Sequence, residues 1–538
     1  MAGLKIERFE GAVHGMAARL LERSQAQRAS NADVRDGDLL PYRGTSQVDT
    51  LAKAGTIETL YRWAEQAWFH WPHDVDVVES PLPSDTEDRV YFTGDGVPKM
   101  TYAGLATSSG DGVYPSNSYD LGVPSPGNPP TITVVGDPDD ENDIGEDRAY
   151  VYTYVTAKGE EGPPSDASAI KLWKPGQSIE VSGMEAGPGG NRNITLKRIY
   201  RTASGSRGTN LQYVDDIDVA ATSYTDTVPT DDLGELLPSA DWNVPPEDMV
   251  DLVAMPNGIL IGHTGNQLVP SESYLPHAWP VDYRLQTASP IVAKAAIGNT
   301  LIVATEDFPE MLTGTDPSAL ALEKADTAYP CLSKRSMADL GFAAVYASTD
   351  GLVKFSQQGP ELLTQALFTP EQWRGYAPES MHAYRFDDYY LVFYDTGSEQ
   401  GGMIVHPNGR WVMFLDLYAS AAWLDPKTGI LKLVLNDNEV HDFDADGVAR
   451  LTAEWRSKTF ITPKPVNFAA AHVDAEAYPV TFRVYGDGQL KGDISVSDNR
   501  PFRLPGGYRA DHWSFEIETD TRVHRFEVAE TMEEIRAR

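Results

Sequence analysis

The chain has 538 residues, of which 41% are hydrophobic, and it carries a formal net charge of −35 with an isoelectric point near 4.6. This length predicts roughly two to four domains, each with its own core. The acidity argues against a conventional nucleic-acid-binding protein, which neutralises phosphates with a basic patch.

Cysteine usage and hydropathy narrow the class further. Cys331 is the single cysteine, so the chain forms no internal disulfide and no cysteine-based zinc site. The segment Met1–Glu10 lacks the apolar run of a signal peptide, and no stretch of about 18 apolar residues occurs. We therefore expect a soluble protein made in a cytoplasm, without a membrane-spanning segment.

The composition favours strands over helices. The 45 glycines and 37 prolines make up about 15% of the chain, which indicates many turns and hence many short strands. Aromatic residues, at 10%, are typical of strands. We therefore expect an all-β fold.

Residues 1–48 are expected to form an N-terminal arm. A short helix is predicted over residues 11–28, with Ala17, Leu20 and Leu21 on one side. The arm then leads into the first strands of a larger β domain.

Residues 49–146 are expected to hold those first strands and an acidic linker. Arg89–Tyr102 predicts a hairpin, because its Asp95-Gly96 pair supplies the positive φ angles of a tight turn. Residues 104–146 are rich in Gly, Pro, Ser and Asp and predict a linker. Its acidic run, Asp137–Asp143, is interpreted as a solvated loop, with a calcium site as the alternative.

Residues 147–238 predict a small inserted β-sandwich. Strands are expected at 149–156, 177–182, 194–202 and 211–215, separated by Gly, Pro and Asn turns. The expected aromatic and aliphatic core consists of Tyr152, Tyr154, Ile199, Tyr200 and Tyr213.

Residues 239–452 predict a β-propeller. Apolar strand pairs are joined by tight turns such as Asn257-Gly258, Asp350-Gly351 and Asn408-Gly409. A blade takes about 40–50 residues, so residues 246–450 hold roughly five blades. Strands from residues 50–103 would supply the remainder and close the ring.

Residues 453–538 predict a C-terminal β-sandwich. Trp455–Phe460, Val480–Tyr485 and Trp513–Glu518 alternate apolar and polar side chains, and Val523–Val528 gives a final strand.

No catalytic, cofactor-binding or metal-binding motif emerges. The nucleophile elbow, the His-Glu-x-x-His zinc motif and the phosphate-binding loop are all missing from the sequence. The 11 histidines are scattered singly, whereas metal sites need clustered ligands. We expect a protein that is not an enzyme, without catalytic, cofactor or metal residues. A pair of carboxylates for glycoside hydrolysis remains open, because no feature singles one out.

Two short segments have competing interpretations. Asp442–Gly447 begins like a calcium-binding EF-hand loop, but Ala453 stands where the closing Glu should be, so a propeller turn with solvated carboxylates is favoured. The sequence His277-Ala-Trp279 could be mistaken for a site, and we expect it to plug a junction between blades.

Several segments together resemble the tail-hub or nozzle proteins of short-tailed bacteriophages. In chain order, the resemblance is carried by residues 12–41, the 149–228 region with Lys197–Thr202 and Tyr224–Asp226, Met255–Pro280, Cys331–Ser336, Ser348–Leu352 and Pro501–Tyr508. The resemblance implies an all-β fold in which a fibronectin III-like β-sandwich interrupts a β-propeller, followed by a C-terminal β-sandwich. This chain is shorter than the largest nozzle proteins, so reduced outer decoration is expected.

The same resemblance implies a structural virion protein. It would form a homo-oligomeric ring, usually of six copies, that extends the portal or adaptor channel for retention and ejection of DNA. Its partners would be the portal-proximal adaptor and other tail proteins or fibres. Genomic DNA would pass through the channel without sequence-specific binding. The acidity is compatible with a highly soluble surface or with a channel wall that repels DNA.

Two other functions are considered. A propeller that binds or degrades polysaccharides could stack sugars on its 11 tryptophans and 25 tyrosines. An intracellular protein-interaction propeller is the third possibility, although it does not explain the N-terminal arm or the terminal sandwich.

Overall fold

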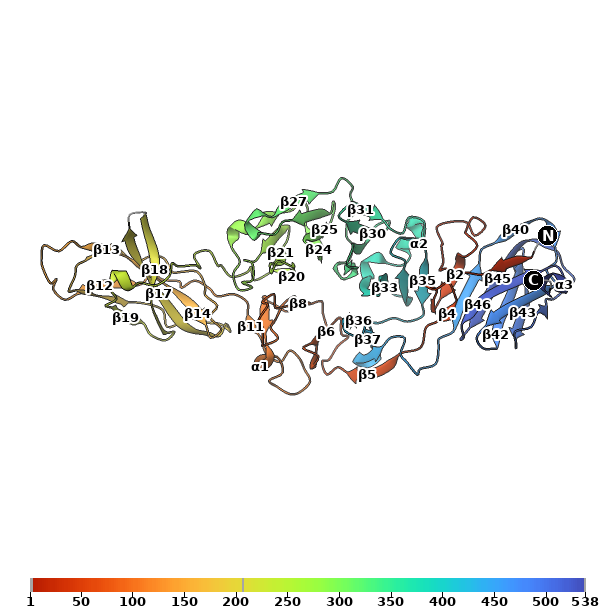
Figure 1. Cartoon of the computed structure of the whole chain (residues 1–538), viewed down its shortest axis with the longest axis horizontal. Coiled ribbons are helices and arrows are strands. Elements are labelled where there is room, and N and C mark those ends of the chain that lie inside the picture. The colour runs from red at the N-terminus through yellow and green to blue at the C-terminus, as the bar shows by residue number, and fades with distance from the viewer. Residues whose placement is uncertain (1–2, 206–207, 537–538) are drawn as a thin grey trace.

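The computed structural model describes residues 3–205 and 208–536 and consists mainly of β-strands and loops. The molecule is elongated, with a β-sandwich at each end of a central propeller (Figure 1). The helices are short: α1 (Ala103–Ala106), α2 (Pro370–Arg374), α3 (Met532–Arg536) and the 3-10 helices η1 (Thr230–Asp232), η2 (Val281–Tyr283), η3 (Pro317–Ala319), η4 (Lys334–Ser336), η5 (Pro378–Ser380) and η6 (Asn436–Asn438). Within the described ranges, no helix is long and apolar enough to span a bilayer.

Seven antiparallel units among the described residues form the propeller blades, six with four strands and one with two. They are, in chain order, β6 (Thr59–Trp63) and β7 (Ala67–Trp71); β8 (Asp76–Glu79), β9 (Val90–Thr93), β10 (Lys99–Thr101) and β11 (Tyr119–Asp120); β20 (Val250–Ala254), β21 (Leu260–Thr264), β22 (Gln267–Pro270) and β23 (Leu285–Gln286); β24 (Ile291–Ile297), β25 (Thr300–Thr305), β26 (Glu310–Thr313) and β27 (Ala321–Lys324); β28 (Ala338–Asp339), β29 (Ala344–Ser348), β30 (Gly351–Ser356) and β31 (Gly359–Leu362); β32 (His382–Phe386), β33 (Tyr389–Asp395), β34 (Gln400–Val405) and β35 (Val412–Leu415); and β36 (Ala421–Leu424), β37 (Leu431–Leu435) and β38 (Glu439–Asp442) with β5 (Ser46–Thr50).

The first strands of successive blades contact one another and form the ring. These contacts run from β8 through β20, β24, β28, β32 and β36 to β6. Between β6 and β8 the link is a hydrogen bond from the Val75 amide to Thr59 Oγ1 at 2.9 Å. The five blades that start between Val250 and Ala421 match the number expected from blade length.

Tight turns hold the blades in register. The expected Arg89–Tyr102 hairpin is present, with Phe92 paired to Lys99. At the β34–β35 turn, Gly409 has a φ of 61°, and an added Cβ would lie 1.9 Å from the Leu363 carbonyl oxygen. Only glycine therefore fits at this position.

The N-terminal segment closes the propeller. Strand β5 forms the outer strand of the last blade, pairing with β38 so that Asp49 lies opposite Val440. The ring is thus completed by residues from near the two ends of the propeller sequence, which are about 390 positions apart along the chain.

The predicted helix over residues 11–28 is wrong. The N-terminal segment instead contributes β1 (Leu4–Ile6), β2 (Ala26–Ser30), β3 (Ala32–Asp33) and β4 (Leu40–Pro41) before β5. Phe9, Ala12 and Val13 are fully or almost fully buried, whereas Leu20 is 64% exposed. Tertiary burial of alternate segments outweighed the weak helical pattern.

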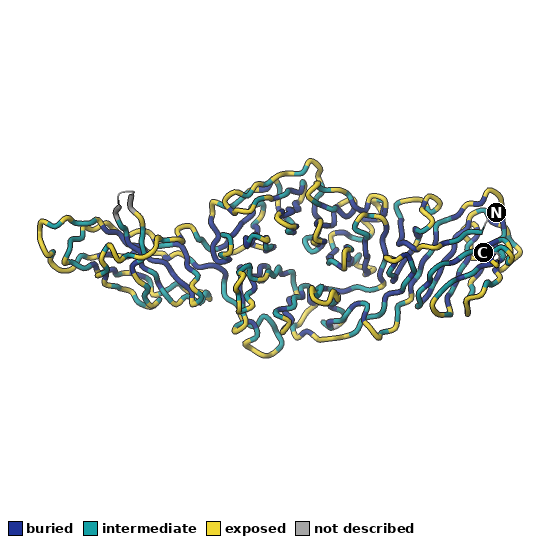
Figure 2. The backbone as a smooth tube through the Cα atoms, viewed as in Figure 1, coloured by how far each residue is buried: buried dark blue, intermediate teal, exposed yellow. Residues whose placement is uncertain are grey.

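The C-terminal sandwich has two sheets, and the N-terminal segment enters both. One sheet holds β39 (Ala453–Ser457), β40 (Phe460–Val466), β42 (Val480–Gly486), β43 (Gln489–Val496) and β45 (Ala510–Thr519); the other holds β1, β41 (Ala470–Ala475), β44 (Phe502–Arg503) and β46 (Val523–Ala529). Strand β2 pairs with β39 and, through Ser30 and Phe414, with β35. One continuous sheet therefore joins a propeller blade to the sandwich, with its centre buried (Figure 2).

The inserted module begins earlier than residue 147. It comprises β12 (Thr131–Val135), β13 (Glu146–Arg148), β14 (Tyr150–Thr156), β15 (Lys171–Trp173), β16 (Ser178–Ser182), β17 (Ile194–Gly205), β18 (Gly208–Asp218) and β19 (Ser223–Asp226). Residues 131–135, expected in a linker, pair with β16. The order β14-β17-β18 matches the C–F–G sheet of immunoglobulin-like sandwiches, and β12-β16-β19 forms the opposite sheet.

The module has a core of its own. Tyr152, Tyr154, Ile199 and Tyr200 are buried as expected, but Tyr213 is only half-buried and Val214 is buried next to it. At the centre, Arg201 forms a fully buried ion pair with Asp226, which also accepts a hydrogen bond from the Tyr150 hydroxyl. Arg201 and Asp226, two of the residues that carry the family resemblance, therefore pair with each other inside the sandwich.

Deleting the module should leave the propeller folded. The chain leaves and re-enters the propeller at one place, because a Cβ added to Gly122 would lie 3.1 Å from Val244 Cα. We expect a variant with residues 124–242 replaced by a short Gly/Ser bridge to keep a cooperative thermal transition by circular dichroism. A broad transition or aggregation would show that the module is integral to the propeller core.

Truncating Phe9 should destabilise the whole protein. Its fully buried ring meets Trp455 edge-on at a centroid distance of 4.9 Å and also contacts Phe526. We expect Phe9→Ala to lower the free energy of unfolding by about 3–5 kcal/mol in denaturant titrations. Val48→Ala, in the same arm but 49% exposed, is the control and should cost less than about 1 kcal/mol.

Candidate functional site: a charged cavity on the propeller axis

A cavity of about 300 Å³ lies where the first strands of the blades meet. Its wall is built by residues in or next to β6, β8, β20, β24, β28, β32 and β36, together with η4. Seven charged side chains line it: Glu58, Asp74, Asp76, Asp251, Lys294, Lys334 and Arg335. The cavity is therefore polar and carries one more carboxylate than cations.

Lys334 connects distant blades across this cavity. Its Nζ lies 2.6 Å from an oxygen of Asp74, which precedes β8, and 2.7 Å from an oxygen of Asp76, the first residue of β8. Lys334 itself comes from η4, which precedes β28. The neighbouring Arg335 donates to the backbone oxygens of Glu58 and Ser420. The Cys331–Ser336 motif thus supplies two of the three cations of the cavity, Lys334 and Arg335.

A second ion pair joins the next two blades. Lys294 Nζ, with a fully buried side chain, lies 2.8 Å from Asp251 Oδ2 and 2.6 Å from His263 Nδ1. Asp251 has a φ of 56° and forms the irregularity in the pairing of β20 with β21. A non-glycine residue in this left-handed region is strained, and the position directs its carboxylate to Lys294.

Burial and charge shift the protonation of these groups. Burial, opposed by Lys334 and reinforced by neighbouring Asp251 and Asp74, raises the pKa of Asp76 to about 6. Burial and Lys294 lower the pKa of His263 to about 3, so its imidazole is neutral at pH 7. Because the folded pKa of Asp76 is raised, its contribution to stability falls as pH rises from about 4 to 6.

The arrangement suits an electrostatic clamp between blades. Each cation is held by a carboxylate or by backbone oxygens of another blade, so the charges satisfy one another. Cys331 nearby is buried, and burial raises the pKa of its thiol to about 12, which makes it a poor nucleophile. Tyr384 is the one aromatic residue of the cavity wall in the described structure, so there is no stacking platform for a sugar.

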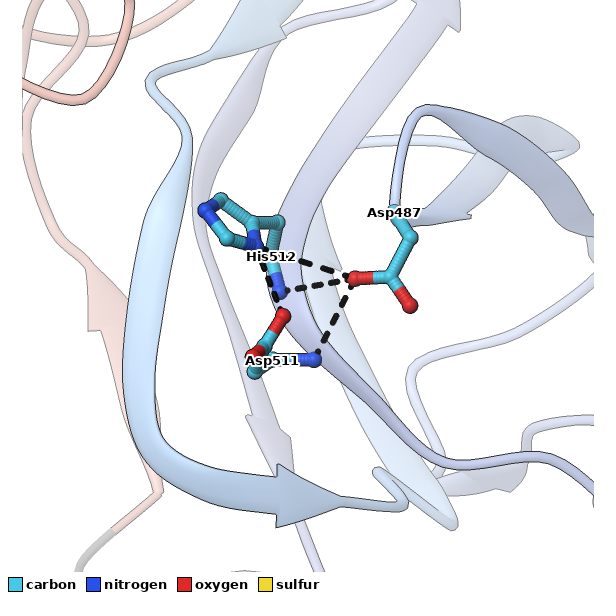
Figure 3. Close-up of side chains that lie close together, drawn as sticks. All are labelled: Asp487, Asp511 and His512. Atoms are coloured by element: carbon cyan, nitrogen blue, oxygen red, sulfur yellow. Dashed lines mark hydrogen bonds and ion pairs between the residues drawn. The ribbon is translucent and has the colours of Figure 1, made fainter.

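Asp487, Asp511 and His512 form the one group of potential metal ligands that the described residues bring together (Figure 3). Asp487 Oδ1 accepts hydrogen bonds from the backbone amides of Asp511 and His512 at 3.3 and 3.1 Å. His512 Nδ1 lies 2.7 Å from Asp511 Oδ1. These contacts fasten the β42–β43 turn to the start of β45. The Asp487-Gly488 turn was visible in the sequence, but its partners become neighbours only through sheet pairing.

The EF-hand-like segment holds its carboxylates in ion pairs. Asp442 pairs with Lys432, and Asp444 and Asp446 both lie near Arg43, Asp446 at 3.2 Å. These three acids are therefore held by two cations of the protein, Lys432 and Arg43, consistent with the propeller-turn interpretation.

His277 and Trp279 lie at a blade junction, as expected. Trp279 is fully buried and packs with Tyr91, Met100 and Leu260, which belong to the blades β8–β11 and β20–β23. Its indole N–H donates to the Pro276 oxygen at 2.9 Å.

Comparison with known proteins gives no family. No family model matches the chain, and no curated protein sequence matches it. Solved structures similar to it include the WD40 domain of Neurospora crassa Pan2 (7% identity, 51% of this chain and 86% of that chain, TM-score 0.27) and apo AztD of Citrobacter koseri (12%, 68% and 100%, TM-score 0.28). PorZ of Porphyromonas gingivalis, a surface component of the type-IX secretion system, is similar at 12% identity over 87% of this chain and 69% of that chain, with a TM-score of 0.28. The propeller assignment itself rests on the blade topology.

Replacing Lys334 tests the clamp. Lys334→Met leaves Asp74 and Asp76 without a cation, and we expect a loss of about 2–3 kcal/mol at pH 7, between the values of surface and fully buried pairs. The deficit should shrink toward pH 5, where Asp76 takes up a proton. Urea unfolding at several pH values measures both effects. Adding Asp76→Asn should recover part of the loss. Lys427→Met, whose side chain is 72% exposed, is the control; an equal, pH-independent loss in both variants would contradict the clamp.

Proposed function

We propose that this chain is a structural protein of a short-tailed bacteriophage tail, forming a homo-oligomeric ring that extends the portal or adaptor channel. The observation that carries this proposal is the order of the motifs along one chain. The motifs run from the N-terminal arm through the inserted sandwich, the Met255–Pro280 blade and the Cys331–Ser336 segment to the terminal sandwich.

The positions of these motifs support a scaffold rather than a catalyst. Arg201 and Asp226 are fully buried in the module core, Trp279 fills a blade junction, and Lys334 joins blades across the axis. Each of these four residues contributes to packing or to an internal ion pair. Residues that hold elements together suit a protein that bears mechanical load in a particle.

The charge supports a non-adhesive channel. Six copies at −35 each would carry about −210, which is hard to confine to an outer surface. A negative wall prevents the counterion release that makes DNA bind, so DNA could slide past. The carbohydrate-binding alternative finds less support, because the axial cavity offers charges and a single aromatic wall residue.

The ring is tested on the full-length protein and on virions. We expect native mass spectrometry to give a closed oligomer, with six copies the leading stoichiometry, and electron microscopy of virions to place it below the portal. Its lumen should be lined mainly by Asp and Glu. A protein that is monomeric both in solution and in the particle, or that is missing from virions, would refute the proposal; a lumen of Lys and Arg would refute the non-adhesive channel.

A further inference from the structure

One end of the molecule carries an exposed basic and aliphatic surface, which we name the arm patch: Met16, Arg19, Leu20, Arg23, Ile461 and Lys464. The patch forms because the turn at residues 17–21 lies against β40, with the Thr459 amide donating to the Ala18 oxygen at 3.0 Å. Lys458 Nζ fastens the same turn by donating to the Leu21 oxygen. The turn and β40 are thus held as one surface.

The arm patch combines exposed aliphatic side chains with cations that form no ion pair in the described structure. Its aliphatic side chains are exposed, Leu20 by 64%, Ile461 by 53% and Met16 by 40%. Its cations Arg19, Arg23 and Lys464 have no ion-pair partner among the described residues. The carboxylate of Glu22, in the same turn as Arg23, faces Arg410, and that of Asp511, next to the Ile461 partner His512, faces His512. Unpaired cations around exposed aliphatics suit a partner of opposite charge with an apolar contact.

The opposite end carries a matching acidic and aliphatic surface, which we name the acidic tip: residues 137–147 with Ile170 and Leu172. Residues 137–147 contain seven Asp or Glu and no Lys or Arg. Glu146 is the one carboxylate of these seven with an ion pair in the described structure, to Arg148. Ile144 is 91% exposed, Ile170 67% and Leu172 57%.

Leu172 lies against the segment that carries Ile144. Leu172 pairs with Asp147 across β13 and β15, and a Cβ added to Gly145, the residue after Ile144, would lie 2.7 Å from Leu172 Cδ1. The tip thus presents exposed aliphatic side chains next to six carboxylates without an ion pair in the described structure, with Lys171 between Ile170 and Leu172.

The charge of the whole chain also differs between the two ends of the molecule. Residues 1–48 and 453–538, which build the end with the arm patch, contain 19 Lys or Arg and 20 Asp or Glu. Residues 131–238 contain 9 Lys or Arg and 19 Asp or Glu. A nearly neutral end with a local basic patch therefore faces away from a strongly acidic end.

We propose that the acidic tip of one copy docks on the arm patch of a neighbouring copy. The two surfaces lie at opposite ends of the elongated chain, so a single copy cannot bring them together (Figure 1). A contact that uses two different patches is head-to-tail, the type that builds closed rings. This inference rests on the proposed ring and names the surfaces that hold it. The exposed aliphatic side chains favour a protein partner over nucleic acid, which cations alone would bind.

Charge reversal and its rescue test the contact on the full-length protein. Arg19→Glu with Arg23→Glu should weaken assembly by roughly tenfold or more in light scattering across a concentration series. Adding Glu141→Lys and Asp147→Lys to the same chain restores complementarity and should restore assembly. Arg500→Glu with Arg503→Glu makes the same change of charge at exposed positions of the terminal sandwich and is the control. Ile144→Ser should also weaken assembly, without changing the net charge.

A second measurement locates the contact directly. Carbodiimide cross-linking of a mixture of isotope-labelled and unlabelled protein should join Lys464 of one copy to a carboxylate within residues 137–147 of another. Assembly that survives both the charge reversal and Ile144→Ser, or cross-links that leave these segments out, overturns the docking contact while the ring itself stands. Failure to rescue with intact circular dichroism also overturns it. Detection of the protein in virions, which tests the proposed function, does not depend on either result.

Discussion

The pairing of β5 with β38 is the interaction on which the rest of the structure depends. A propeller is a row of sheets until its ends are joined, and here residues 46–50 supply the outer strand of the blade that ends at Asp442. The same N-terminal segment also runs through both sheets of the C-terminal sandwich by way of β1 and β2. Ring closure and attachment of the sandwich are therefore one structural event, made by the first 50 residues.

The axial ion pairs add a constraint of a different kind. Backbone pairing holds strands within a blade, but in residues 3–205 and 208–536 no hydrogen-bond ladder joins one blade to the next around the axis. Lys334 and Lys294 cross those gaps by charge. A buried ion pair contributes little net stability compared with apolar packing, but leaving one of its charges unpaired is costly. We therefore infer that these pairs favour the observed order of blades, while Trp279 and similar residues supply apolar packing between them.

The inserted module and the terminal sandwich give the molecule two ends that differ in charge. The module is attached where the chain leaves and re-enters the propeller at Gly122 and Val244, so its tip lies far from the sandwich (Figure 1). The carboxylates of the tip and the cations of the arm patch lie at opposite ends of the chain. Such an asymmetric distribution is what a repeating head-to-tail assembly requires, since each copy must offer two different surfaces.

The sequence by itself determined the class of fold, because alternation and turn chemistry are local. The Asp95-Gly96 hairpin, the five blades from Val250 onward and the strands of the terminal sandwich follow from period-two patterns and tight-turn pairs. The position of Trp279 at a junction between blades was also predicted from the sequence, where prolines flank His277-Ala-Trp279.

Tertiary structure alone decided the path of the N-terminal arm, the position of the module's first strand and the set of residues that line the axial cavity. Residues 11–28 have a pattern compatible with a helix, but burial of Phe9 and Val13 against the sandwich selected an extended path. The segment expected to be a linker contains a strand at 131–135, before its acidic run, because β16 offers a partner there. Asp76, Asp251, Lys294 and Lys334 are spread over some 260 positions and become neighbours only when the blades close into a ring. Local sequence patterns predict the strands. They do not predict which charged residues become neighbours, because those contacts form only when the blades close into a ring.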